Sequence, residues 1–208
     1  MADSTQLTRR SFLASAAASL PASIALGSRP KAAPIIDTHM HVWSDDAKKY
    51  PFRHPYKPDF EKAPHPATVE MLLRDMDQHG CTHSVLVQVI YHGWDNTYVA
   101  DCARQHPKRL KAHGLIDPTD PHVADKLEFW MKEHRLHGMR FSPIYYQNGQ
   151  HGGDAWLNAK DTHRLWKKAD DLGAVFNFFI GPMQLPKLAT MVKAHPKVRV
   201  IIDHLLSL

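Results

Sequence analysis

The stretches "THSVLVQVI" at residues 82–90 and "AVFNFFI" at residues 174–180 decide the fold. Each is a nearly unbroken apolar run of strand length, rich in β-branched or aromatic residues. A strand with apolar side chains on both faces must be covered on both sides, which is typical of a parallel sheet with helices packed over it. The two runs therefore predict buried strands of an α/β protein.

Outward from these two runs, the sequence alternates between strand and helix patterns. Further β-rich runs lie at residues 34–41, 109–116, 136–141 and 198–204. Segments with helical spacing lie at residues 68–79, 96–105, 121–134, 161–172 and 185–194. This alternation predicts either an open doubly wound sheet or a barrel. No glycine-rich phosphate loop follows a strand, so we favour a (β/α)8 TIM-barrel type with only about six βα units present.

The composition is that of an ordinary globular domain. Of the 208 residues, 43% are hydrophobic and 23% are charged, which is enough for one core. The net charge is +5, but the basic residues are scattered among 21 acidic ones. We therefore predict a small-molecule substrate rather than a nucleic-acid partner, and leave a possible oligomer open.

The first residues resemble an export signal. In "TRRSFLASAAASLPASIALGS", residues 8–28, the pair Arg9 and Arg10 precedes a short, weakly apolar run. This pattern is typical of a twin-arginine signal, and the run is too short for a comfortable membrane span. We predict a signal peptide at residues 1–30 and a partial barrel domain at residues 31–208. The protein would then be periplasmic or exported, with no stable membrane anchor.

A pair of histidines closes the first predicted strand. Residues two apart in a strand point to the same face, so His39 and His41 should project together with Asp37. Two such imidazoles can bind one divalent metal or bracket a substrate carbonyl without metal. Their position just before a long loop favours a catalytic role over a hydrogen-bonded core pair.

The last and the fourth strands offer further candidates. Asp203 and His204 are adjacent, so only one of them can point inward, and the alternation of apolar residues does not decide which. Arg140 lies between Met139 and Phe141 and should therefore point inward. There its guanidinium could hold a substrate carboxylate or lactone oxygen, with a buried ion pair as the alternative.

Two long loops, at residues 44–67 and 142–158, are rich in aromatic residues and would emerge at the carboxyl ends of strands. That rim is where barrel enzymes place their chemistry. We therefore expect both loops to form walls of a site. Tyr50 in the first loop and Asn96 in the stretch after the second strand are candidates for substrate binding.

Four motifs together resemble the amidohydrolase-related family of the amidohydrolase superfamily, and most closely its lactonase-type branch. The motifs are "IIDTHMHVW" at residues 35–43, "VLVQVIYHGWDNTYV" at 85–99, "HGMRFSP" at 137–143 and "HPKVRVIIDH" at 195–204. The resemblance implies a distorted (β/α)8 barrel that hydrolyses a lactone or related carbonyl compound at its rim. It matches His39 and His41 to the first-strand pair and His204 to the sixth-strand histidine, which makes these three the predicted catalytic residues. It also implies a divalent metal, most often zinc, on His39 and His41 in some members, and metal-independent chemistry in others.

The sequence departs from this family in ways that bear on activity. The family's general base is an aspartate of the eighth strand, whereas the printed sequence ends after the sixth, so we expect a truncated chain. Leu206 also replaces the usual glycine after the sixth-strand histidine. Two alternatives therefore stay open beside the hydrolase, namely a catalytically inactive fragment that at most binds metal or ligand, and a metal-dependent decarboxylase of the same superfamily.

Overall fold

The computed structural model describes residues 33–206. The export signal predicted at residues 1–30 lies outside these residues. One compact unit begins at Pro34 and contains every element described below.

The alternation of strands and helices predicted from the sequence is confirmed. The strands are β1 (Ile36–Met40), β2 (His83–Val87), β3 (Leu110–Leu115), β4 (Gly138–Phe141), β5 (Val175–Phe178) and β6 (Arg199–Ile202). The helices are α2 (Val69–His79), α3 (Thr97–Gln105), α4 (Val123–Lys132), α5 (Thr162–Leu172) and α6 (Leu185–Ala194). None of the helices within residues 33–206 is long and apolar enough to cross a membrane.

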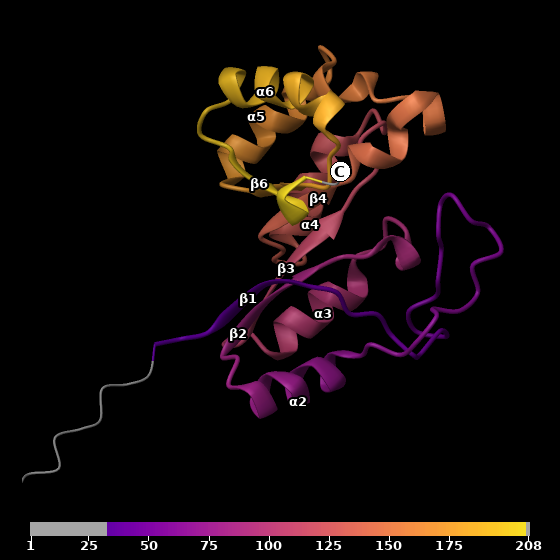
Figure 1. The fold of residues 1–208 in the computed structure, drawn as a ribbon, viewed down its shortest axis with the longest axis vertical. Helices are drawn as coiled ribbons and strands as arrows, with labels where there is room; N and C mark the ends of the chain where they lie inside the picture. The colour runs from indigo at the N-terminus through magenta and orange to yellow at the C-terminus, as the bar shows by residue number, and fades with distance from the viewer. Residues whose placement is uncertain (1–32, 207–208) are drawn as a thin grey trace, which may run out of the picture. The chain divides into compact units, whose positions relative to one another are not determined.

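The strands form one parallel sheet in the order β1-β2-β3-β4-β5-β6. Each strand pairs with the strand that follows it in the chain, because a helix returns the chain across the sheet between them. The sheet curls into part of a barrel with helices packed against it, as Figure 1 shows from β1 in indigo to β6 in yellow. This is the predicted barrel type, with six strands and five α-helices within residues 33–206.

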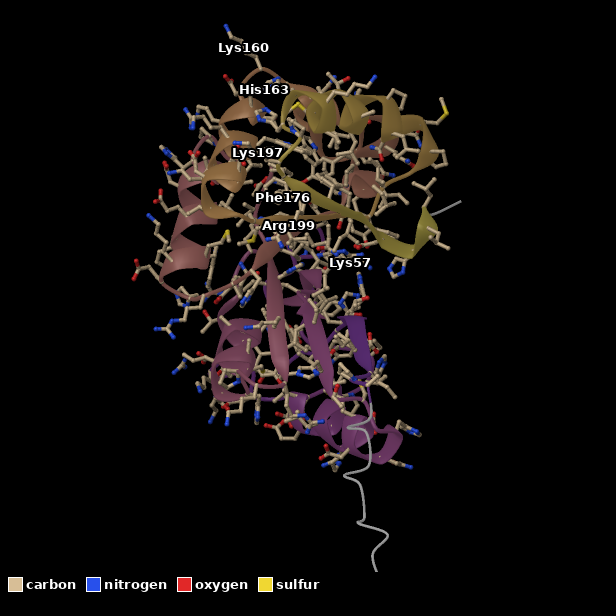
Figure 2. All side chains as sticks on the ribbon, turned by 90° about the vertical axis from the view of Figure 1, so that its left-hand side faces the viewer. Lys57, Lys160, His163, Phe176, Lys197 and Arg199 are labelled. Carbon is tan, nitrogen blue, oxygen red and sulfur yellow. The ribbon has the colours of Figure 1, made fainter. Side chains whose placement is uncertain are left out.

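An aromatic core packs between β4, β5 and α5. Phe176 is fully buried, and its ring centroid lies 5.0 Å from that of Phe141 and 5.6 Å from that of Trp166. Figure 2 shows Phe176 among the side chains between the strands and the helices, whereas Lys160 points outward. The apolar face of β5 is therefore turned toward the helices, which leaves its other face for polar residues.

The strand register places polar side chains on that other, inner face. Arg140 of β4 pairs with Asn177 of β5, which pairs with Ile201 of β6. Partners in register lie side by side and point to the same face of a parallel sheet. Asp203 follows Ile201 by two residues, so it too arrives at the inner face, close to Arg140 and Asn177.

Strand β1 contains an irregularity that corrects one expectation. Asp37 pairs with Ser84 and Met40 with Leu86, so three residues of β1 match two of β2. Asp37 therefore shares a face with Met40 and does not lie beside the histidines as simple alternation predicted. Its Oδ1 instead accepts a hydrogen bond of 3.1 Å from the backbone N–H of His39.

Apolar side chains are exposed at the two outer strands. Ile35, Ile36 and Ile201 are 57%, 54% and 44% exposed. Within residues 33–206, β1 and β6 each pair with a single neighbour. The apolar residues at these two edges are therefore the least covered of the sheet.

The close approach of β4 and β5 requires glycine at position 138. A Cβ atom at Gly138 would lie 1.9 Å from the carbonyl oxygen of Val175. Because backbone atoms of a paired strand cannot yield, we expect Gly138→Ala to lower the free energy of unfolding by about 3 kcal/mol. Urea unfolding of the folded protein measures this change.

Gly80→Ala is the matched control. Gly80 has open space around its Cα but a φ of +72°, so alanine there should cost only about 1 kcal/mol. Equal losses in the two variants would contradict the close packing of β4 against β5.

Candidate active site

Residues from four strands and one following turn meet at the inner face of the sheet. Their centre is Asp203, whose side chain is buried directly after β6. Its Oδ2 accepts a hydrogen bond of 2.9 Å from Arg140 Nε, and its Oδ1 accepts one of 3.0 Å from Asn177 Nδ2. His39 Nδ1 lies 3.5 Å from the same Oδ1, at the far edge of the sheet. One carboxylate thus joins β1, β4 and β5.

The surroundings of Asp203 keep its carboxyl group ionised. Burial alone would raise the pKa of this group, because a charged form loses its hydration. The neighbouring imidazole of His39, the amide of Asn177 and the charge of Arg140 outweigh burial and lower the pKa of Asp203 to about 2. Asp203 is therefore a weak base, suited to orienting neighbours rather than to taking a proton.

A buried histidine contacts Asn177 on the side away from Asp203. His113 of β3 is 6% exposed, and its Nδ1 is 2.7 Å from Asn177 Oδ1. Burial lowers the pKa of His113, so its imidazole is neutral near pH 7. The polar chain therefore extends across the sheet from β3 to β1.

The histidine pair predicted from the sequence comes together as expected. The ring centroids of His39 and His41 lie 4.9 Å apart. His41 Nδ1 is 2.7 Å from the carbonyl oxygen of Val87, so this nitrogen carries the hydrogen and Nε2 is left bare. Burial lowers the pKa of His41 to about 4, which keeps its imidazole neutral at physiological pH. His39 Nε2 is buried and has no hydrogen-bond partner among the described residues.

Asp203, not His204, is the residue that points inward. Strand β6 ends at Ile202, and the chain turns at once, with His204 in the left-handed region at a φ of 56°. His204 is exposed, yet its ring centroid lies 4.9 Å from that of His39. The structure therefore brings all three predicted histidines to the rim, with His204 on the solvent side.

Arg140 lines a small pocket that is partly open to solvent. Its Nε is bonded to Asp203, so the buried ion pair weighed from the sequence is present. Its two terminal nitrogens make no hydrogen bond within the described residues, and they are not among the buried unpaired atoms. They therefore remain able to bind a ligand in the pocket.

The aromatic loops after β1 and β4 form part of the pocket wall. Tyr56 from the first loop and Tyr145 and Tyr146 from the second line it, together with Trp94. The hydroxyls of Tyr56 and Tyr146 lie 2.6 Å apart, and the Tyr56 ring stacks on His151 at 3.8 Å. The two loops expected to wall the site are thus joined at Tyr56.

The other two predicted substrate-binding residues do not line this pocket. Asn96 is fully buried, and its Nδ2 and Oδ1 hydrogen-bond to the carbonyl oxygen and N–H of Leu115 at 2.8 and 2.6 Å. The Tyr50 hydroxyl donates a hydrogen bond of 2.7 Å to Asp101 of α3. Both residues fasten a loop or helix to its neighbour, and contact of either with a substrate stays a prediction.

The sequence analysis assigned no role to His113 or to Asn177. Both interrupt apolar strand runs, "LKAHGL" in β3 and "VFNF" in β5. A polar side chain inside a buried strand needs a partner, and that need is the signal that could have identified them.

Comparison with known families agrees with this geometry. The model of the amidohydrolase family matches residues 36–205. That range covers most of the chain and includes every strand and helix described here, so the chain belongs to the amidohydrolase family. No curated protein matches it.

Several solved structures share the fold. A probable 2-pyrone-4,6-dicarboxylic acid hydrolase from Acinetobacter baumannii, with citric acid bound, is 25% identical with a TM-score of 0.65 over 83% of this chain and 58% of that one. An amidohydrolase from Burkholderia multivorans with bound zinc is 21% identical with a TM-score of 0.58 over 83% and 58%. A 2,6-dihydroxybenzoate decarboxylase from Rhizobium is 12% identical with a TM-score of 0.57 over 81% and 65%. The chain thus spans about 58% of the length of the first of these.

Metal binding can be tested against the residues themselves. The free Nε2 atoms of His39 and His41 are nitrogen donors of the kind that zinc prefers. Catalytic zinc sites use three protein ligands, however, and residues 33–206 contain no group of three or more histidine, cysteine, aspartate or glutamate side chains placed to hold a metal. The described residues therefore supply two ligands and do not fit a complete metal site.

The depressed pKa of His41 predicts a pH-dependent stability. In the unfolded chain a histidine binds its proton near pH 6.5, whereas in the fold His41 does so only near pH 4. The unfolded state therefore binds more protons between these values, and stability falls as the pH drops through them. We expect protonation of His41 alone to lower the free energy of unfolding by about 2 kcal/mol between pH 7.5 and pH 5.0.

Urea unfolding at the two pH values measures this loss in the wild type and in His41→Gln. The variant lacks the titrating group, so its stability should change by about 2 kcal/mol less between the two pH values. The same pH dependence in both proteins would contradict a buried, neutral His41.

Proposed function

We propose that this protein hydrolyses a lactone or a related cyclic carbonyl compound. The observation that carries the proposal is the pair His39 and His41, whose Nε2 atoms have no hydrogen-bond partner within residues 33–206. His39 also contacts Asp203, which holds an arginine that lines an aromatic pocket. The named function of the solved relative at 25% identity, a probable hydrolase of a pyrone dicarboxylic acid, supports the same substrate type.

The residues present suit the first step of such a hydrolysis. A water molecule attacks the ring carbonyl carbon, and a bare imidazole nitrogen accepts the proton that the water loses. The ring C–O bond then breaks, and its oxygen takes up a proton to give the hydroxy acid. His39 is the better proton acceptor of the pair, because its Nδ1 lies beside the Asp203 carboxylate, whereas burial lowers the pKa of His41 to about 4 and makes it a weak base.

Arg140 would orient the substrate. A guanidinium whose Nε is fixed by Asp203 presents its two terminal nitrogens in a defined plane, which suits a carboxylate or the developing charge on a carbonyl oxygen. The rings of Tyr56, Trp94 and Tyr146 would cover the faces of a flat substrate.

Two further parts of the proposal come from the sequence. We propose export by the twin-arginine route, because Arg9 and Arg10 precede a short apolar run. Decarboxylation remains the second candidate reaction, but the decarboxylase structure is 12% identical and shares only the fold. Hydrolysis is therefore the reaction to test first.

The first test removes the imidazole pair. We expect the double variant His39→Ala, His41→Ala to lose about a thousandfold in kcat/KM on a panel of lactones that includes cyclic dicarboxylic acids, since proton transfer by a placed side chain contributes roughly 100- to 10,000-fold. A pH-stat records the acid released on ring opening and so measures the rate of hydrolysis. Carbon dioxide release without ring opening would instead identify a decarboxylase.

His163→Ala, His195→Ala is the matched control. These two histidines also contact each other, with His163 Nδ1 2.9 Å from His195 Nε2, but they lie on α5 and at the end of α6, and Figure 2 shows His163 near the outward-pointing Lys160. This control should keep wild-type turnover. Unchanged turnover in the His39, His41 variant would refute the proposed site.

A second test addresses Arg140. Lysine keeps the charge beside Asp203 but cannot present two parallel N–H donors to a carboxylate. We expect Arg140→Lys to raise KM by about 10- to 100-fold for lactones that carry a carboxylate, and to leave KM for uncharged lactones nearly unchanged. Equal effects on both substrate types would show that Arg140 does not bind the carboxylate.

A further inference from the structure

A chain of polar side chains, all buried except the partly exposed His39, runs from β3 to β1 beside the proposed site. It passes from His113 Nδ1 to Asn177 Oδ1 at 2.7 Å, and from Asn177 Nδ2 to Asp203 Oδ1 at 3.0 Å. It ends at His39, whose Nδ1 lies 3.5 Å from the same carboxylate oxygen. Hydrogen bonds thus link His113, Asn177 and Asp203, and His39 lies within salt-bridge distance of the same carboxylate.

The direction of each contact follows from which atoms can donate. An ionised carboxylate only accepts, so Asn177 must turn its NH2 group toward Asp203. The amide oxygen of Asn177 then faces His113, and because this oxygen also only accepts, His113 must donate from Nδ1. The orientation of Asn177 is therefore fixed from both sides.

The same rule decides the hydrogen position on His39. The contact between His39 Nδ1 and the Asp203 carboxylate is favourable only if Nδ1 carries a hydrogen. A neutral imidazole has only one ring N–H hydrogen. Its Nε2 is then a bare acceptor. Within residues 33–206 that atom is buried without a hydrogen-bond partner, which is unfavourable for the fold unless a ligand, a water molecule or a substrate uses it.

We propose that Asn177 and His113 are positioning residues, which act through Asp203 to hold His39 in the form with hydrogen on Nδ1 and a bare Nε2 facing the site. In a purely structural network, every buried donor and acceptor would find a hydrogen-bond partner within the network. This one ends instead on a nitrogen that no other described residue pairs with. The use of that nitrogen in turnover rests on the proposed hydrolase function, whereas the hydrogen position itself does not.

The test measures the hydrogen position directly. The full chain is prepared with isotope-labelled histidine, and two-bond proton–nitrogen correlation spectra at pH 7.5 report which ring nitrogen of each histidine carries hydrogen. The signals of His39 are those lost in His39→Gln. In the wild type we expect His39 to carry hydrogen on Nδ1.

Asn177→Leu removes both hydrogen bonds at similar side-chain volume. Without the amide, Asp203 is held less firmly, and we expect the ratio of the Nδ1–H to the Nε2–H form of His39 to fall about tenfold, the size typical of weakening a hydrogen bond to a charged group. Gln184→Leu is the matched control. It removes another buried amide, one that bonds to Pro143 and Asp154 outside the network, and should leave His39 unchanged.

A second pair of variants tests the proposal independently, in case the Asn177→Leu protein does not fold. His113→Gln retains a donor for Asn177 Oδ1 and should keep the wild-type ratio at His39, whereas His113→Leu should lower it. The proposal is overturned if wild-type His39 carries hydrogen on Nε2, or if the ratio is unchanged in Asn177→Leu or in His113→Leu. Lactone turnover plays no part in this measurement, so failure of the hydrolase proposal would be seen separately.

Discussion

A negative charge buried among strands persists only where donors and positive charge surround it, and Asp203 imposes that condition on the sheet. Its carboxylate is 2% exposed, yet it belongs to the last described strand region and is held by residues of β1, β4 and β5. The first and last strands are therefore linked by a polar contact although they do not pair through their backbones within residues 33–206. Curling of the sheet and assembly of the site thus depend on the same group.

The strands and helices could be predicted because their signals are local. Apolar runs such as residues 82–90 identify buried strands without knowledge of the rest of the chain, and Met139 and Phe141 correctly placed Arg140 on the opposite, inner face. The partner of Arg140 could not be predicted in the same way. Asn177 lies beside it because of the register between β4 and β5, which is set by packing over the whole sheet.

The end of β6 likewise could not be predicted from the local sequence pattern. Alternation along the strand did not decide between Asp203 and His204, because both follow the last regular strand residue, Ile202. Two features decide which residue points inward. The turn places His204 in the left-handed region, and the Arg140 guanidinium on the inner face donates a hydrogen bond to the Asp203 carboxylate. Likewise, Asn96 lies within a family motif, yet its amide is occupied by the backbone of Leu115, a contact that no local pattern records.

The contact of Tyr56 with both Tyr146 and His151 joins two loops that are about ninety residues apart in sequence. Each loop contributes aromatic rings to the pocket, and the shape of one depends on the other. The shape of the pocket therefore cannot be redesigned one loop at a time. A library that varies residues 44–67 while keeping the loop after β4 fixed would mostly yield variants in which the two loops no longer contact each other. New pocket shapes would instead arise when both loops are exchanged together.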